Sequence, residues 1–146
     1  MADDVEKLLR FIAHRYVARE EILEIERDAT AADEGHEIVA DQRRAIQSEE
    51  QRALEMADAF REGLRRADAA RRAGGNAISL DDRKSEDDRI ADALIHFLVR
   101  TGIASSTTRE TDQHRYIYTI SVDWNALDRV SHDAKVNLGD LLGRGG

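Results

Sequence analysis

The chain has 146 residues, a length that suits one domain, or one small domain with an extended helical part. Charged residues make up 36% and aromatic residues 5%, so the apolar residues suffice for one modest core but not for two. With 22 Lys and Arg against 30 Asp and Glu, the formal net charge is -8, which argues against a protein that holds nucleic acid mainly by neutralising phosphates.

The absence of cysteine excludes disulfides, thiol catalysis and cysteine-based zinc sites. The residues after Met1 do not resemble a signal peptide, and no apolar run approaches the roughly 18 residues of a membrane-spanning helix. We therefore expect a cytoplasmic protein that does not bind a membrane. Proline is also absent, so long helices lack their main interrupter.

A first amphipathic helix is predicted to begin at Asp3 or Asp4 and to run for about 25 residues. Its apolar residues recur at spacings of three and four: Val5, Leu8, Leu9, Ile12, Tyr16 and Leu23. The pattern falters between residues 28 and 35, where Thr30 and Asp33 resemble a capping pair that starts a new helix.

A second helix is predicted to run to about Arg72. Its seam follows near-heptad spacing: Val39, Gln42, Ile46, Glu49, Ala53, Met56, Phe60, Leu64 and Ala67. Polar Gln42 and Glu49 weaken this seam as a coiled coil, which favours a hairpin with the first helix plus a partner chain. We therefore predict a homodimer through these helices. Without a break near Thr30, residues 4–72 would instead form one rod of roughly 100 Å.

Residues 74–84 are predicted to be a linker. Gly74 and Gly75 end the second helix, as glycines just past a helix do. Ile78 and Leu80 then alternate with polar residues, which is typical of a short strand or of an extended connection.

A third helix is predicted to start at Ser85, with Asp88 as the partner of Ser85 in a capping pair, and to run to about residue 100. Only Asp92 and His96 are polar between residues 90 and 99, so this helix is expected to be buried on most sides at the centre of the core. Asp92 and His96 lie one turn apart, and we predict an ion pair between them at the surface.

A polar strand is predicted for residues 103–109 and a loose turn for residues 110–114. The clearest alternation in the chain follows, with one apolar and aromatic face: Tyr116, Tyr118, Ile120, Val122 and Trp124. We expect this face to pack on the preceding helix as core rather than to stack on nucleic-acid bases. The polar strand, Ser105 to Thr108, leaves an edge that could accept a partner strand.

The end of the chain is predicted to return to the core. Asp123 is placed to cap a short helix that runs through Val130. A last apolar patch follows it: Val136, Leu138, Leu141 and Leu142. No internal repeat is visible.

The segment from Ser85 to Trp124 resembles the third helix and wing of a winged-helix domain. The resemblance rests on a helix ending in LVRTGIA (residues 98–104), then a polar strand, a turn and an aromatic strand. It implies DNA binding, with the start of the helix in the major groove and the hairpin on the backbone. The acidic start of this helix would face the phosphates with negative charge, however, so a docking role toward protein fits better: Glu86, Asp87, Asp88 and Asp92.

The sequence thus predicts a mostly helical α+β fold. Residues 1–73 form a helical hairpin or coiled coil that serves as a dimerisation arm, and residues 74–84 form the linker. Residues 85–142 form a small winged-helix-like domain with a β-hairpin, and residues 143–146 are a tail.

The arginines near the end of the second helix form the only basic cluster: Arg61, Arg65, Arg66, Arg71 and Arg72. They either contact phosphate or an acidic partner, or complement the helix dipole and pair with Glu62 and Asp68, and the second interpretation is favoured. The candidate contacts to nucleic acid or to an acidic partner are Arg61, Arg65, Arg72, Arg83, Lys84, Arg89, Arg109 and Arg115.

The sequence contains no phosphate-binding glycine loop and no nucleophile motif, and we predict no cofactor and no metal site. The predicted function is therefore a non-catalytic binding or assembly protein, with a dimerisation arm and an acidic docking domain, such as an accessory subunit of a DNA-handling or regulatory complex. The alternative is a DNA-binding transcriptional regulator of the winged-helix type.

Overall fold

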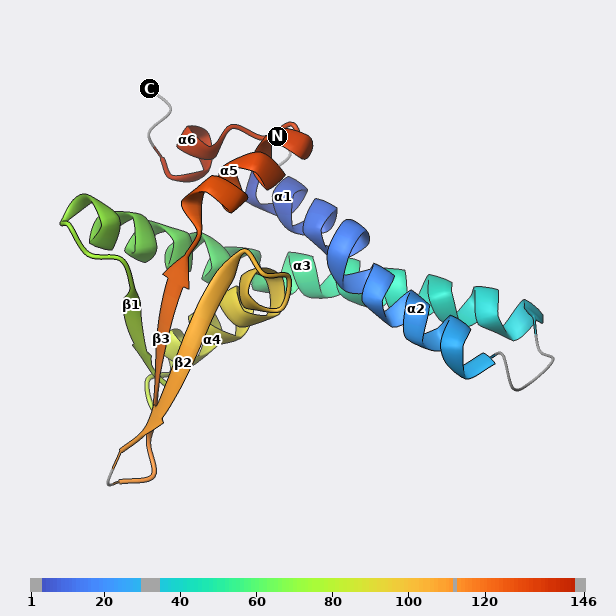
Figure 1. Ribbon diagram of the computed structural model, residues 1–146, viewed down its shortest axis with the longest axis horizontal. Helices are drawn as coiled ribbons and strands as arrows, with labels where there is room; N and C mark the ends of the chain where they lie inside the picture. The colour runs from blue at the N-terminus through green and yellow to red at the C-terminus, as the bar shows by residue number, and fades with distance from the viewer. Residues whose placement is uncertain (1–3, 30–34, 112, 144–146) are drawn as a thin grey trace.

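The structure is a computed structural model that describes residues 4–29, 35–111 and 113–143, with the backbone alone at 18, 20, 28, 29 and 35–39. The fold is α+β, mostly helical with a three-stranded antiparallel sheet. Figure 1 shows a central body from which a helical arm projects on one side and a β-hairpin on another. Among the described helices, none combines the length and the apolar character needed to cross a membrane.

The first predicted helix is a continuous helical run with a change of pitch in its middle. It comprises α1 (Asp4–Ile12), a π-helical turn η1 (Ala13–Val17) and α2 (Ala18–Ala29). The second predicted helix is α3 (Gly35–Arg72), and both α1 and α2 pack along it, so the two runs form a hairpin and not one rod. The predicted capping pair of Thr30 and Asp33 lies outside the described residues.

The inner half of the hairpin is held by the apolar spacing that predicted it. Helix α1 buries four residues, Val5, Leu8, Leu9 and Ile12. The facing residues of α3 are also buried: Ala53, Ala57, Phe60 and Leu64. Helix α3 ends as expected, with Gly74 at a positive φ of 90° that favours glycine.

The next elements are β1 (Ile78–Asp81), α4 (Ser85–Leu94) and a second π-helical turn, η2 (Ile95–Val99). The predicted linker thus contains a strand. The predicted capping role of Ser85 is wrong, because Ser85 already belongs to the helix and Lys84 is the N-cap, without a side-chain hydrogen bond. The side chain of Asp87 instead turns back to the strand, where Asp87 Oδ2 accepts the backbone N–H of Asp81 at 3.1 Å.

Strands β2 (Ala104–Glu110) and β3 (Tyr116–Val122) form the hairpin, and β3 lies in the centre of the sheet order β1-β3-β2. Ile120 lies opposite Ile78 on one side and Ser106 on the other. Helix α4 covers one face of this sheet (Figure 1). The alternation therefore predicted the strand correctly, and Ile120 on its predicted inner face is fully buried.

The ends of the predicted aromatic face differ from expectation. Tyr118 is partly buried against the core, but Tyr116 is 41% exposed because it lies at the last residue pair of the hairpin, opposite Glu110. Trp124 does not belong to the strand. It opens α5 (Trp124–Asp133), where the Arg71 guanidinium lies 3.9 Å from the centre of its ring. The strand stops before it because Asp123 caps α5, as predicted, by accepting the Ala126 N–H at 3.1 Å.

The end of the chain returns to the start of the chain. After α5, the short helix α6 (Leu138–Leu141) packs near α1, and Lys7 Nζ donates to the backbone carbonyl of Lys135 at 3.2 Å. The sequence did not predict α6, which Asn137 caps by accepting the Asp140 N–H.

One hydrophobic core crosses the predicted boundary between arm and domain. Phe60 of α3 meets Phe97 of η2 edge to face, with ring centres 6.3 Å apart. Helices α3 and α4 approach most closely at Gly63, where an added Cβ would lie 2.9 Å from Ile90 Cγ2 and Leu94 Cδ1. Only the outer part of the hairpin therefore projects, while its inner part belongs to the core.

We predict that Gly63→Val destabilises the protein by about 1–3 kcal/mol, because its side chain would be forced into the crossing of α3 and α4. Urea unfolding followed by circular dichroism measures this change. The matched control is Ala69→Val on the exposed side of the same helix, with an expected cost of about 0.5 kcal/mol. Equal stability of the two variants would show that the helices do not cross closely at Gly63.

Candidate functional site: the arm, its root and the adjoining groove

The arm is the outer part of the hairpin, residues 19–27 of α2 and 40–48 of α3. None of its described side chains is buried. Its apolar residues Ile22, Ile25 and Ile46 are half-buried, and Leu23 is 49% exposed. The two helices touch through polar groups as well, since Gln42 Nε2 donates to Glu26 Oε1 at 3.2 Å. The arm therefore keeps apolar surface that the described fold leaves uncovered.

The root of the arm is the place where α2, α3 and η2 meet around Glu49. The Glu49 side chain is buried, with the whole residue 2% exposed, and its Oε2 lies 2.7 Å from His96 Nε2. Glu21 of α2 is hydrogen-bonded to Glu49 from the other side, and Arg100 lies 3.8 Å from Glu21 Oε1. A buried carboxylate is thus paired with groups from two other elements, as a buried charge requires.

Both π-helical turns bring a histidine to the same turn of α3. His14 of η1 pairs with Glu50, and His96 of η2 pairs with Glu49. The wider turn of η2 is visible in its backbone, where the Arg100 N–H donates to the Ile95 carbonyl at 2.9 Å. Single π-helical turns inside α-helices are rare and often occur at functional sites, which draws attention to the root.

The two carboxyl groups at the root titrate in opposite directions. Burial alone would raise the pKa of Glu49, but its hydrogen bonds to His96 and Glu21 outweigh burial and hold the pKa below its ordinary value. Burial raises the pKa of Glu21, and its hydrogen bond to the Glu49 carboxylate adds to that effect. Of the two carboxyl groups, Glu49 therefore ionises at the lower pH.

The predicted surface ion pair of Asp92 and His96 is wrong. The His96 side chain is 12% exposed and turns to Glu49, because the buried carboxylate needs a hydrogen-bonding partner that Asp92 cannot be. Asp92 is left exposed, and its pKa is raised by partial burial of the carboxyl group and by the nearby charge of Asp88. In the part of the chain that the structure describes, no three His, Cys, Asp or Glu side chains are arranged to hold a metal ion.

A groove between α3 and α4 begins at this root. It consists of three hollows of about 500, 200 and 460 Å³, in which neighbouring hollows share lining residues. Arg52, His96 and Arg100 line the hollow next to the root. Glu55, Met56 and Ala59 of α3 and Arg89 and Asp92 of α4 line the middle hollow. The far hollow is mainly acidic, with Glu55, Asp58, Glu62 and Glu86 among its lining residues.

The arginines at the end of α3 pair within the body. Arg66 Nη1 contacts Asp87 Oδ1 at 2.7 Å and also approaches Glu62, while Arg71 and Arg72 both contact the buried Asp68, at 2.7 and 3.0 Å. The favoured interpretation of pairing with Glu62 and Asp68 is thus confirmed for these three. Of the candidate contacts here, Arg61 pairs with Asp58 at 2.9 Å, Arg72 is among the paired residues, and Arg65 is exposed.

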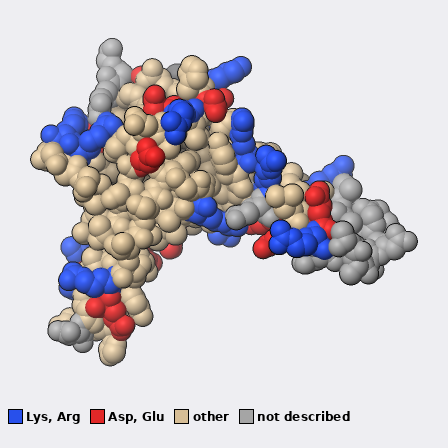
Figure 2. All heavy atoms as spheres, viewed as in Figure 1, with Lys and Arg blue, Asp and Glu red and all other residues tan. Residues whose placement is uncertain are grey.

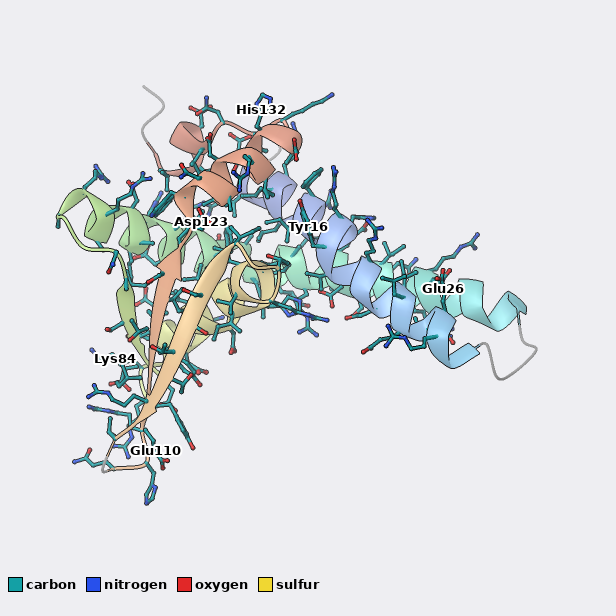
Figure 3. All side chains as sticks on the ribbon, in the orientation of Figure 1. Tyr16, Glu26, Lys84, Glu110, Asp123 and His132 are labelled. Carbon is teal, nitrogen blue, oxygen red and sulfur yellow. The ribbon has the colours of Figure 1, made fainter. Side chains whose placement is uncertain are left out.

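The remaining candidate contacts lie in two other places. Arg83 Nη2 donates to the Gln113 carbonyl at 2.6 Å, and Arg115 contacts Asp81 at 3.4 Å, so both stabilise the hairpin. Lys84 and Arg109 are exposed, and Arg89 lines the groove. Figure 2 shows charges of both signs near the end of the hairpin, where Figure 3 places Lys84 and Glu110. The predicted basic residues do not form one continuous patch.

Sequence reasoning missed the root of the arm as a site. Its only signal was Glu49, one of two polar residues on the seam of the second helix, and the partner of Glu49 is 47 residues away in the chain. Comparison with known proteins finds no matching family model, no similar curated protein and no similar solved structure.

We predict that Glu21→Gln raises the stability of the protein at pH 7. Because the pKa of Glu21 is raised on folding, its ionisation at neutral pH costs stability, and glutamine removes that cost and offers an amide N–H to the Glu49 carboxylate. The gain should shrink as the pH falls through the raised pKa of folded Glu21 and vanish below about 4, where Glu21 is protonated in the folded and in the unfolded chain. Urea midpoints at both pH values measure the difference.

Glu24→Gln is the matched control, because Glu24 is exposed on the same helix. We expect it to change the midpoint little at either pH. A lower stability of Glu21→Gln at pH 7 would contradict the proposed arrangement of the two carboxyl groups.

Proposed function

We propose that this chain is a non-catalytic binding or assembly protein that forms a homodimer through its arm and docks a partner on its acidic body. The uncovered arm is the observation that carries the proposal. Helices of this length are marginal in water unless an apolar face is packed, and the described side chains of the arm bury none of theirs fully. A second copy of the arm would supply the missing cover as a four-helix arrangement.

The charges of the arm suit a second copy. Exposed Glu24 and Glu26 lie on α2, while exposed Arg43 and Arg44 lie on α3; Figure 3 labels Glu26 on the arm. In a two-fold dimer each surface meets its own counterpart, so α2 of one copy could face α3 of the other. Opposite charges would then meet around the apolar centre near Leu23.

The composition of the groove supports binding rather than covalent catalysis. Its lining among the described residues contains no serine, threonine, cysteine, lysine or tyrosine. His96 is engaged by buried Glu49 and has no hydroxyl or thiol nucleophile beside it in that lining. Carboxylates beside apolar side chains suit a surface that binds a partner through opposite charge and apolar contact.

We predict that light scattering gives the mass of a dimer for the unmodified chain, and that Leu23→Arg converts it to a monomer by placing a charge in the apolar centre. Leu54→Arg is the matched control, because Leu54 is an exposed leucine of α3, 38% exposed, that lies outside the arm. A monomeric wild type, or a loss of the dimer in the Leu54 variant alone, would contradict self-association through the arm.

The alternative function is DNA binding by a winged-helix domain. In a helix-turn-helix the two helices are joined by a turn of three or four residues, as a rule, whereas α3 and α4 are joined through strand β1. The first turn of α4 also carries Glu86, Asp87 and Asp88. Of the cations expected to contact DNA, Arg83 donates to Gln113 in the turn of the hairpin, and Arg115 pairs with Asp81 of β1. These observations favour the docking role.

We predict that the protein does not retard double-stranded DNA in a gel at low salt. Binding at low salt that is lost in the Arg109→Glu, Arg115→Glu double variant would favour the regulator instead. A control double variant, Arg43→Glu with Arg44→Glu on the arm, separates a hairpin contact from general attraction to cations.

A further inference from the structure

The groove between α3 and α4 has the dimensions of a helix-binding site. The stretch of α3 that lines it, from Arg52 to Glu62, is about 15 Å long at about 1.5 Å per residue. The facing wall is formed by α4 and η2, and α4 packs closely on α3 at Gly63. An amphipathic helix of about three turns would fill the three successive hollows.

The floor of the groove is apolar and only partly covered. Met56 and Ala59 face it from α3, and Ile95 and Val99 face it from η2. All four side chains are half-buried and pack against the core, while Ile90 beneath them is 1% exposed. Methionine in such a floor adapts to the shape of an incoming side chain. The floor thus offers one apolar stripe along the groove, which a helix with apolar residues at spacings of three and four matches.

The rim of the groove carries an excess of carboxylates. Five acidic residues line it against three arginines: Glu55, Asp58, Glu62, Glu86 and Asp92 against Arg52, Arg89 and Arg100. Some of these charged side chains already have a partner of opposite charge. Arg66 approaches both Glu62 and Glu86, and Arg100 approaches Glu21.

Two carboxylates that line the middle hollow, Glu55 and Asp92, form no ion pair with a described cation. Glu55, on the α3 wall, accepts a hydrogen bond from Gln51 at 3.1 Å, which is a neutral donor. Asp92, on the α4 wall, lies beside the like charge of Asp88, and burial and that charge both raise its pKa. A lysine or arginine side chain placed between these walls would stabilise the negative charge of both carboxylates.

We propose that the groove docks an amphipathic helix of a partner protein, with apolar residues on the stripe from Met56 to Val99 and lysine or arginine side chains beside Glu55 and Asp92. The inference rests on the docking role proposed above, and it does not require that the arm forms a dimer. A second copy of the chain is the less suitable occupant, because its net charge of -8 repeats the excess of carboxylates already on the rim.

The test uses the full chain and two synthetic helical peptides of about 14 residues. One peptide combines leucines on one face with lysines on its flanks, and its sister carries glutamate in place of lysine. Fluorescence anisotropy should show saturable one-to-one binding of the lysine peptide and none of the sister. The double variant Glu55→Lys, Asp92→Lys should weaken binding about tenfold, equivalent to about 1.4 kcal/mol.

The matched control is Glu110→Lys with Asp133→Lys, which makes the same change of net charge at two exposed residues outside the groove. Equal weakening by both double variants would reduce the binding to general attraction of charge and overturn the proposal. Absence of saturable binding would overturn it as well. Because only exposed residues are changed, circular dichroism of both variants should match that of the wild type.

A second measurement locates the peptide without any variant. Methyl NMR signals of Met56, Ile95 and Val99 should shift on titration, whereas the methyl signals of Leu23 on the arm should not. Shifts confined to Leu23 would overturn the groove. If the peptide dissociates the dimer, the groove holds a second copy of the chain, and the proposed partner helix is wrong. If the protein is a dimer that binds no peptide, only the proposal of helix binding in the groove is refuted. If it is a monomer that binds the peptide, only the proposal of dimerisation through the arm is refuted.

Discussion

The buried carboxylate of Glu49 fixes how the parts of this fold meet. A charge in the interior is tolerated only with hydrogen-bonding partners, and Glu49 finds His96 on η2 and Glu21 on α2. These contacts set the register of the hairpin and the position of α4 relative to it. Removing one partner from such a group costs roughly 3–5 kcal/mol, because it leaves an uncompensated charge in the interior. The root therefore specifies the arrangement that the surrounding leucines and alanines only stabilise.

The sequence predicted those elements whose signals are local. Spacings of three and four marked the hairpin helices, alternation around Ile120 marked the central strand, and Asp123 marked the start of α5. Each of these depends on residues within one or two turns of each other. A local signal also failed at the start of α4. Ser85 and Asp88 have the spacing of a capping pair, but Ser85 is already part of the helix. The acidic side chain that is engaged there is Asp87, which contacts Asp81 and Arg66.

The candidate site could not be predicted because it depends on contacts distant in sequence. Asp92 and His96 looked like a pair at one-turn spacing, and nothing local indicated that Glu49 would lie closer to His96. The groove has the same origin, since its walls are brought together by the close approach of α4 to α3, which Gly63 permits. A glycine inside a long helix predicts that another segment packs closely against it, but it does not indicate which segment.

The arm and the groove meet at the root, and this limits how independently they can act. Arg52, His96 and Arg100 line the groove, while His96 and Arg100 also contact the carboxyl groups of Glu49 and Glu21. A helix bound in the groove would remove water from these side chains and strengthen their attraction to the two carboxylates. Thermodynamic linkage is reciprocal. The free energy by which a bound helix strengthens dimerisation of the arm therefore equals the free energy by which dimerisation strengthens binding of the helix.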